Sequence, residues 1–314
     1  MTVDISVISN VVAMLFTMLL VGFGARKLNW VNDTTSKQIS NLLIKVAQPL
    51  LIISSQMKVE YSIENLKNGA VVFLIGIVAH GILSVLAFLS TRFLSDRDKR
   101  KICEFALIFA NCGFLGYPVM EAVMGSQGLF YASIYVLTFN IYTWTWGMVI
   151  LGRGRDDIKI KPKNMVINFG TIPCILGLIL YVSQLPVPGF IVDGMSSIGS
   201  ICTPMSVFLC GMLLAKVSFK NIFTRVSVYY VSALKLVVFP LIITLLAKLC
   251  RLPDTMIYVA AIMSALPTAA NTVMFAEMYD IEQEYAAQIV GTATALCVAS
   301  VPLVVYVAGL IVAL

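Results

Sequence analysis

Two apolar segments of the sequence contain glycine, proline and asparagine where a regular helix would not place them. The first, FANCGFLGYPVME at 109–121, holds Asn111, Gly113, Gly116 and Pro118 within eight residues. Proline removes a backbone donor and clashes with the preceding turn, while glycine relaxes the backbone. We therefore expect unwound backbone here. Its free N–H and C=O groups, together with the neutral amide of Asn111, could bind a ligand.

The second such segment is SALPTAANTVMFAEMY at 264–279, which contains Pro267, Thr268 and Asn271. An ordinary packed proline kink is the alternative for either break alone. Two breaks in corresponding places favour unwound segments that cross, with half-helix N-termini directed at an anion. Asn111 and Asn271 are the principal predicted ligands. The full predicted substrate-binding set is Gln48, Asn111, Gly113, Gly116, Tyr117, Pro118, Pro267, Thr268 and Asn271.

Three ionisable residues in or at the edge of apolar runs are candidates for coupling or charge compensation, because such groups are functional by default in a membrane. Lys235 could offset an anionic substrate or a carboxylate such as Glu104. His80 belongs to the side-chain type that titrates near neutrality, so it could report or carry a proton. A structural charge and a satisfied core imidazole are the respective alternatives. No Asp lies deep in any apolar run, which argues against cation exchange as the main task.

The elements that must position these residues are apolar helices. Apolar types make up 59% of the 314 residues and charged types 12%, about half the charged share of soluble proteins. A spanning helix needs roughly 20 mostly apolar residues. The sequence therefore predicts an all-α integral membrane protein. The ten predicted spans are 5–25, 38–57, 69–94, 102–124, 128–151, 166–184, 190–215, 227–249, 255–277 and 285–313.

Positive charge sets the predicted orientation. Of the 22 Lys and Arg residues, 16 fall in alternate loops on one side, 4 on the other, and Lys45 and Lys235 fall within spans. Excess Lys and Arg mark the cytoplasmic side. We therefore expect a multi-pass protein of the cell membrane with both termini outside. The net charge of +6 is explained by these loops. We therefore expect the lipid bilayer, and no nucleic acid, as a partner.

The chain divides into two halves that resemble each other. Residues 1–151 and 166–314 each hold five predicted spans, joined by a short cytoplasmic linker at 152–165. Pro49 and Pro204 are 155 residues apart, and other matches share an offset of 154. Because five is odd, the second half must insert with the opposite orientation. Inverted repeats with a substrate site at mid-membrane are a transporter architecture.

The broken segments also carry a family resemblance. ALPTAANTVMFAEMYDI at 265–281 resembles the ninth-span signature of the auxin efflux carriers, the PIN-FORMED carriers and their bacterial relatives. VGFGARKLNWVNDTTSKQISNLLIKVAQPLLIIS at 21–54 resembles the family's first loop and second span. Asn111 followed by Gly116-Tyr117-Pro118 matches its Asn-then-G-x-P pattern. The long central loop of the plant members is absent, as is a proline next to Asn111. Both differences favour a bacterial-type carrier of organic anions.

This resemblance implies a two-part bundle. A scaffold would use spans 1, 2, 6 and 7 and form a homodimer. A transport domain of spans 3–5 and 8–10 would move in an elevator-like manner, with the substrate carboxylate near Asn111 and Asn271. The predicted function is a secondary transporter of small organic anions such as malate or an indole acid. Phe114, Tyr117 and Phe275 could line an aromatic pocket, although membrane aromatics more often face lipid or the core.

Two other functional classes can use a bundle of apolar helices. A sodium-coupled organic-anion symporter of the bile-acid type would share the inverted repeats and the crossing, and sodium dependence of uptake would separate it. An enzyme would need a nucleophile–base pair or a metal cluster, and the sequence has a single histidine without HExxH context and no GxSxG motif. We therefore expect no catalytic residues, no metal and no cofactor.

Overall fold

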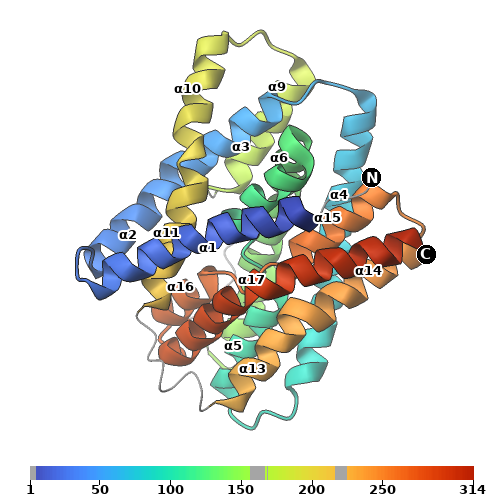
Figure 1. The fold of residues 1–314 in the computed structure, drawn as a ribbon. Helices are drawn as coiled ribbons and strands as arrows, with labels where there is room; N and C mark the ends of the chain where they lie inside the picture. Colours follow the sequence, from blue (N-terminus) through green and yellow to red (C-terminus); the bar gives the residue numbers. More distant parts are fainter. Residues whose placement is uncertain (1–4, 156–166, 168, 216–224) are drawn as a thin grey trace.

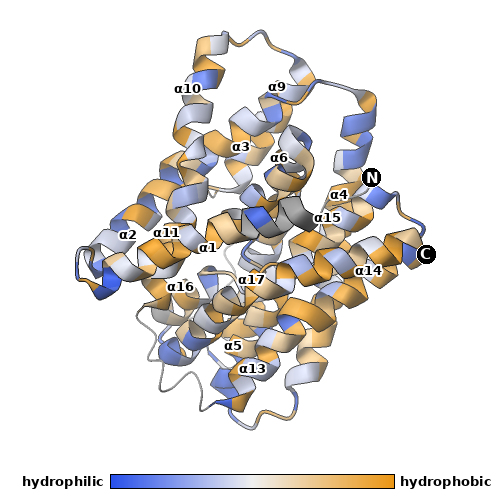
Figure 2. Ribbon diagram, viewed as in Figure 1, coloured by the Kyte–Doolittle hydropathy of each residue, from blue (hydrophilic) through white to orange (hydrophobic). Residues whose placement is uncertain are grey.

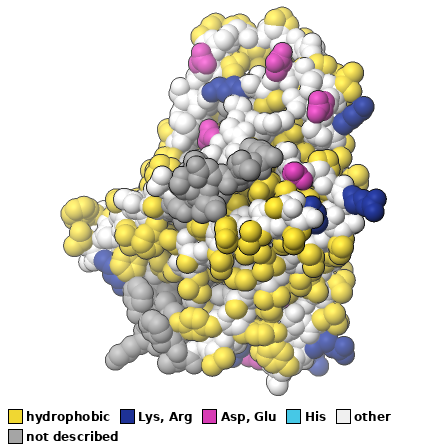
Figure 3. All heavy atoms as spheres, turned by 45° about the vertical axis from the view of Figure 1, so that its right-hand side comes forward, with side chains coloured by type: hydrophobic (Ala, Val, Ile, Leu, Met, Phe, Trp, Pro, Cys, Tyr) yellow, Lys and Arg dark blue, Asp and Glu magenta, His cyan; other side chains and the backbone are white. Residues whose placement is uncertain are grey.

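The computed structural model describes residues 5–155, 167, 169–215 and 225–314. All regular elements among these residues are helices, and their one strand-like contact is an isolated β-bridge. The helices form a single bundle (Figure 1). Apolar residues dominate most of them, while polar residues gather toward helix ends and loops (Figure 2). Figure 3 shows one face largely covered by hydrophobic side chains, with charged ones mostly toward its upper part and its edges. This distribution suits a protein surrounded by lipid.

The helices of each half follow the predicted apolar ranges. In the first half they are α1 (Ile5–Lys27), α2 (Asp33–Leu42), η1 (Leu43–Ala47), α3 (Gln48–Met57), α4 (Ile63–Thr91), α5 (Arg97–Ile108), η2 (Cys112–Gly116), α6 (Tyr117–Tyr142), η3 (Thr143–Gly147) and α7 (Met148–Gly152). In the second half they are α9 (Thr171–Ser183), α10 (Gly189–Ser200), α11 (Cys202–Leu214), α13 (Val226–Ala233), η4 (Leu234–Val238), α14 (Phe239–Leu249), α15 (Asp254–Ala265), α16 (Asn271–Met278) and α17 (Gln283–Ala313).

Five helical runs in the described part of the chain are long and apolar enough to cross a membrane, and they confirm the all-helical, membrane-spanning prediction. The ten-span count, the inverted repeat and the division at 152–165 stay predictions. One run, Cys112–Gly152, covers parts of two predicted spans. The backbone departs from helix at Gly125 (φ 61°, ψ −146°), a conformation that a residue with a Cβ rarely adopts. This glycine is where the fourth and fifth predicted spans part.

Three π-helical turns precede prolines. The turns η1, η2 and η4 each end two residues before one, namely Pro49, Pro118 and Pro240. A proline ring clashes with the carbonyl four residues earlier and cannot bond to it, so a wider turn relieves the clash. For Pro118 that carbonyl belongs to Phe114, and it accepts a hydrogen bond from Ser206 Oγ of α11 at 3.1 Å. The local distortion is thus stabilised by a neighbouring helix.

The remaining packing joins distant parts of the chain. Helix α1 packs along α11, α3 against α9 and α10, α4 against α6, and α15 against α14 and α17. At the α1–α11 contact a Cβ on Gly22 would collide with the backbone of Phe208, and one on Gly211 would collide with the backbone of Leu19. Small residues allow this close approach of helices in membranes. The α1–α11 pair therefore needs glycine on both sides.

Candidate functional site

The two broken segments meet at the centre of the bundle. Helix α5 ends at Ile108 and α15 ends at Ala265, and the chain that follows each of them is extended. Two backbone hydrogen bonds join these stretches, from Asn111 N–H to Pro267 O at 2.7 Å and from Ala269 N–H to Phe109 O at 2.9 Å. Helix then resumes as η2 and α6 on one side and α16 on the other. The starts of these helices consequently lie side by side.

The carbonyl groups at the end of α5 are capped by side chains from the second half of the chain. Lys235 Nζ lies 3.3 Å from Leu107 O and 3.5 Å from Ile108 O. Thr268 Oγ1 donates to Ala106 O at 3.1 Å. Lys235 is 1% exposed, and no carboxylate in the described part of the chain lies within ion-pair distance of it. Its partner is the negative end of a half-helix.

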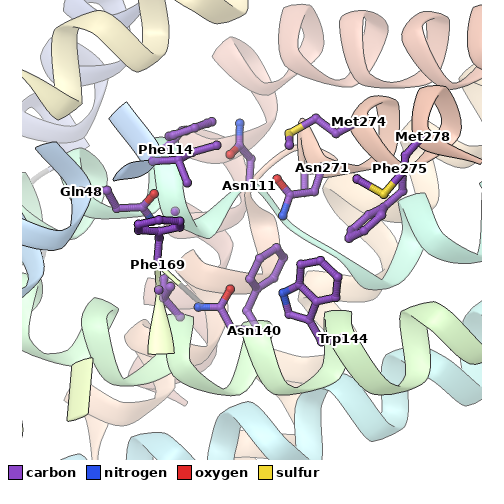
Figure 4. A pocket seen from close by; sticks show the side chains of 16 residues that line it. Gln48, Asn111, Phe114, Asn140, Trp144, Phe169, Asn271, Met274, Phe275 and Met278 are labelled. Carbon is purple, nitrogen blue, oxygen red and sulfur yellow. The ribbon is translucent and has the colours of Figure 1, made fainter. Parts of the chain in front are cut away.

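A cavity of about 180 Å³ lies against the crossing (Figure 4). It is bounded by η1, α3, η2, α6, η3, α16 and the residues that lead into α9. The described residues that line it carry no charge. Its polar side chains are all carboxamides, namely Gln48, Asn111, Asn140 and Asn271. Its aromatic side chains are Phe114, Phe139, Trp144, Phe169 and Phe275.

Asn111 and Asn271 approach the cavity from the two sides of the crossing, as Figure 4 shows. Asn111 is 4% exposed and its side-chain contact is weak, with Nδ2 3.8 Å from Cys210 Sγ. Asn271 is the first residue of α16 and is half-buried. The backbone of Gly113 also lines the cavity, and a Cβ there would stand 3.1 Å from Gln48 Nε2. Helix starts direct N–H groups and positive dipole ends outward, so this region favours an anion.

Two lining residues, one polar and one aromatic, were not identified from the sequence. Asn140 of α6 faces the crossing (Figure 4), and its Nδ2 is buried without a hydrogen-bond partner among the described residues. Trp144 in η3 packs edge-on against Phe275, with ring centroids 5.3 Å apart. An isolated asparagine in the apolar run 128–151 was the available signal. It was overlooked because no proline or glycine stands beside it.

Other predicted binding residues shape the backbone instead of lining the cavity. Pro267 supplies a carbonyl to the crossing, and Thr268 caps α5. Gly116 and Tyr117 are buried where η2 passes into α6, and Pro118 lies in the first turn of α6. None of these residues is in the described lining. Contact of these residues with substrate stays a prediction. Their place in the structure is at the two breaks in the helices.

The predicted coupling residues lie outside the described lining of the cavity. His80 is buried in α4, with Nδ1 2.7 Å from Gly76 O and its ring stacked on Tyr142 at 5.1 Å. Glu104 lies in α5 and is paired with arginines instead of with Lys235. The coupling roles of all three residues stay predictions. In the geometry described, each already has partners within the protein.

Comparison with known proteins identifies the family. A family described as membrane transport protein matches residues 7–305. An uncharacterized transporter of Methanocaldococcus jannaschii is 25% identical over 285 residues, covering 87% of this chain and 90% of that protein. The uncharacterized transporter YfdV of Escherichia coli is 24% identical over 219 residues, covering 67% of this chain and 68% of its own. The resemblance found in the sequence is confirmed, and the chain belongs to the membrane transport family of the PIN-like auxin efflux carriers.

Proposed function

We propose that this multi-pass membrane protein is a secondary transporter of small organic anions, with the substrate carboxylate bound at the crossing between Asn111 and Asn271. The observation that carries the proposal is the backbone pairing of the two breaks. It sets the starts of η2 and α16 against one uncharged cavity. Family membership supports transport. The site residues support an anion.

Electrostatics favour an anion although the described lining of the cavity contains no cation. A helix start carries roughly half an elementary positive charge, and two such starts meet here. Four neutral carboxamides can donate hydrogen bonds without the desolvation cost of a buried ammonium. The aromatic side chains would cover an apolar body. About 180 Å³ is smaller than a typical drug-sized pocket, which favours a small acid.

We further propose an elevator-type movement. Ile44 and Gln48 of η1 and α3 belong to the predicted scaffold, whereas Asn111, Asn140 and Asn271 belong to the predicted transport domain. The cavity therefore lies between the two groups of helices. Sliding one group against the other would carry the site across the membrane while it stays intact. A homodimer formed through the scaffold, and both termini outside, are parts of the same proposal.

The test is uptake of radiolabelled malate and indole-3-acetate into proteoliposomes, with sodium and pH gradients imposed separately. We expect saturable uptake that falls at least tenfold in Asn111→Ala and in Asn271→Ala. Asn41→Ala is the matched control, because Asn41 is exposed on α2 and should leave uptake unchanged. Normal uptake in both site variants would refute the placement of the site.

The sodium arm of the same experiment separates the two carrier classes. Half-helix C-terminal ends and unwound carbonyls are where sodium-coupled transporters hold the ion. In this protein Lys235 Nζ is bound to such carbonyls at the end of α5. We therefore expect uptake without a sodium requirement. Sodium-dependent uptake would favour the bile-acid-type symporter instead.

A further inference from the structure

A second cavity, of about 430 Å³, lies at the far ends of α4, α5 and α7. The described linings of this cavity and of the cavity at the crossing have no residue in common. The positive-charge pattern of the loops places this end on the cytoplasmic side. We call it the arginine cavity. Its lining is Phe88, Arg97, Arg100, Lys101, Glu104, Arg153 and Gly154.

A buried carboxylate holds two of the guanidinium groups in place. Glu104 is 1% exposed. Arg100 Nε donates to Glu104 Oε1 at 3.0 Å, and Arg153 Nη1 donates to Oε2. Thr91 Oγ1 adds a weaker contact at 3.4 Å. Arg100 and Arg153 are thus fixed before any ligand arrives, so binding immobilises fewer flexible groups.

The Phe88 ring lies near the same two arginines and a third one, Arg92. The guanidinium carbons of Arg92, Arg100 and Arg153 lie 5.8, 5.1 and 5.8 Å from the centre of the Phe88 ring. A guanidinium group has five N–H donors. Arg100 and Arg153 each use a single donor in their bonds to Glu104, and their side chains are 27% and 35% exposed. Donors therefore remain available to a ligand.

The arginine cavity has a surplus of positive charge. Four cationic side chains line it, and Glu104 is the one anionic side chain in its described lining. Lys101 is also paired with Asp98 at 2.7 Å. Arg97 has no ion pair among the residues that the structure describes. The cavity therefore keeps a net charge near two positive units, which attracts an anion.

We propose that the arginine cavity binds the phosphate of an anionic lipid headgroup in the cytoplasmic leaflet. Arginine pairs of fixed geometry match the oxygen atoms of a phosphate group, and basic pockets between helices on this side suit such headgroups. The source of the phosphate is argued from the neighbouring surface. Phe88, Leu89 and Phe93 expose 40%, 54% and 63% of their area at the end of α4, where the acyl chains of a bound lipid would lie. A soluble phosphate would gain nothing from that surface.

The experiment measures the thermal unfolding midpoint of the full chain in neutral detergent while phosphatidylglycerol is added. Phosphatidylcholine is the neutral-lipid arm and inorganic phosphate the soluble-anion arm. We expect phosphatidylglycerol alone to raise the midpoint in a saturable manner. Each basic residue near an anionic headgroup is worth about a fivefold change in affinity. Half-saturation should therefore need about five times more phosphatidylglycerol in Arg97→Gln.

Arg97→Gln is the main variant because it disturbs none of the ion pairs that the structure describes, so its fold is expected to survive. Arg97→Gln/Arg153→Gln should weaken the response about 25-fold. Lys67→Gln/Arg251→Gln is the matched control, with two exposed cations at the opposite predicted surface, and should respond like wild type. An equal response in Arg97→Gln and wild type, or an equal loss in the control, would overturn the proposal. A response to inorganic phosphate without one to phosphatidylglycerol would assign the cavity to a soluble anion and also overturn it.

Discussion

Lys235 is expected to stabilise the crossing by capping the end of α5. Replacing it with methionine keeps an unbranched side chain one atom shorter and removes the amine that lies against the carbonyls of Leu107 and Ile108. These carbonyls end α5 directly before the crossing, in residues that are at most 1% exposed, and Lys235 is their donor in the described part of the chain. We expect Lys235→Met to loosen the crossing and to reduce both stability and uptake.

The size of the effect follows from the two contacts. A buried carbonyl without a partner costs about 1–3 kcal/mol. Distances of 3.3 and 3.5 Å are long, so the lower part of that range applies to each. Methionine leaves no unpaired ion behind, which avoids the larger penalty of a half-broken buried pair. We expect a loss of about 2 kcal/mol, or about 3 °C in the unfolding midpoint for a chain of 314 residues.

The assay is thermal unfolding of the purified protein followed by intrinsic fluorescence, with uptake measured in parallel. Lys45→Met is the matched control, because Lys45 also lies in a π turn before a proline but its side chain is exposed. The control should shift the midpoint by less than about 1 °C, as surface substitutions usually do. If Lys235→Met unfolds at the wild-type temperature and transports normally, the capping argument is refuted.

Three further predictions follow from single contacts. Ser206→Ala removes the donor to Phe114 O and should cost about 1–2 kcal/mol, measured as a lower unfolding midpoint. Asn140→Ala should raise KM for the transported anion up to about tenfold. It should change stability little, because Nδ2 has no hydrogen-bond partner to lose among the described residues. An unchanged KM would count against the role of Asn140. Asp96 caps α5, and its hydrogen bond from Lys99 holds the pKa of its carboxyl below the usual value. Because the folded-state pKa is depressed, this contribution is present above about pH 4 and is lost as the pH falls. Asp96→Asn should therefore lower the midpoint slightly at pH 7, by less than about 2 °C for so exposed a pair, and the difference should shrink as the pH falls through the depressed pKa of Asp96.

The sequence was sufficient to locate the breaks and to predict apolar helices. Proline and glycine act on the backbone within one turn of their own position, so Pro118 and Pro267 could be interpreted without knowing their neighbours. The π turns could not be predicted, because a proline in a helix is equally compatible with a simple kink. Gly125 was likewise not predicted as the point where two spans part.

The polar contacts of the interior were beyond sequence reasoning because they depend on which helices become neighbours. Lys235 was expected to offset a substrate or a carboxylate such as Glu104. In the described part of the chain, Glu104 pairs with arginines, and the amine of Lys235 lies against backbone carbonyls. Asn140 is a single polar residue in an apolar run, and no proline or glycine beside it marks a break in the helix. Residues far apart in sequence supply both environments, and the spacing of residues along one chain segment does not contain that information.

The capping of α5 bears on how the chain assembles. Thr268 donates to a carbonyl 162 residues earlier in the chain, and Lys235 to one 128 residues earlier. Until both arrive, the end of α5 exposes unpaired carbonyls at membrane depth, which lipid cannot satisfy. Such long-range closure forms late in folding. The first half of the chain inserted on its own is therefore expected to hold α5 and η2 loosely, and to become a quality-control substrate unless the second half follows promptly.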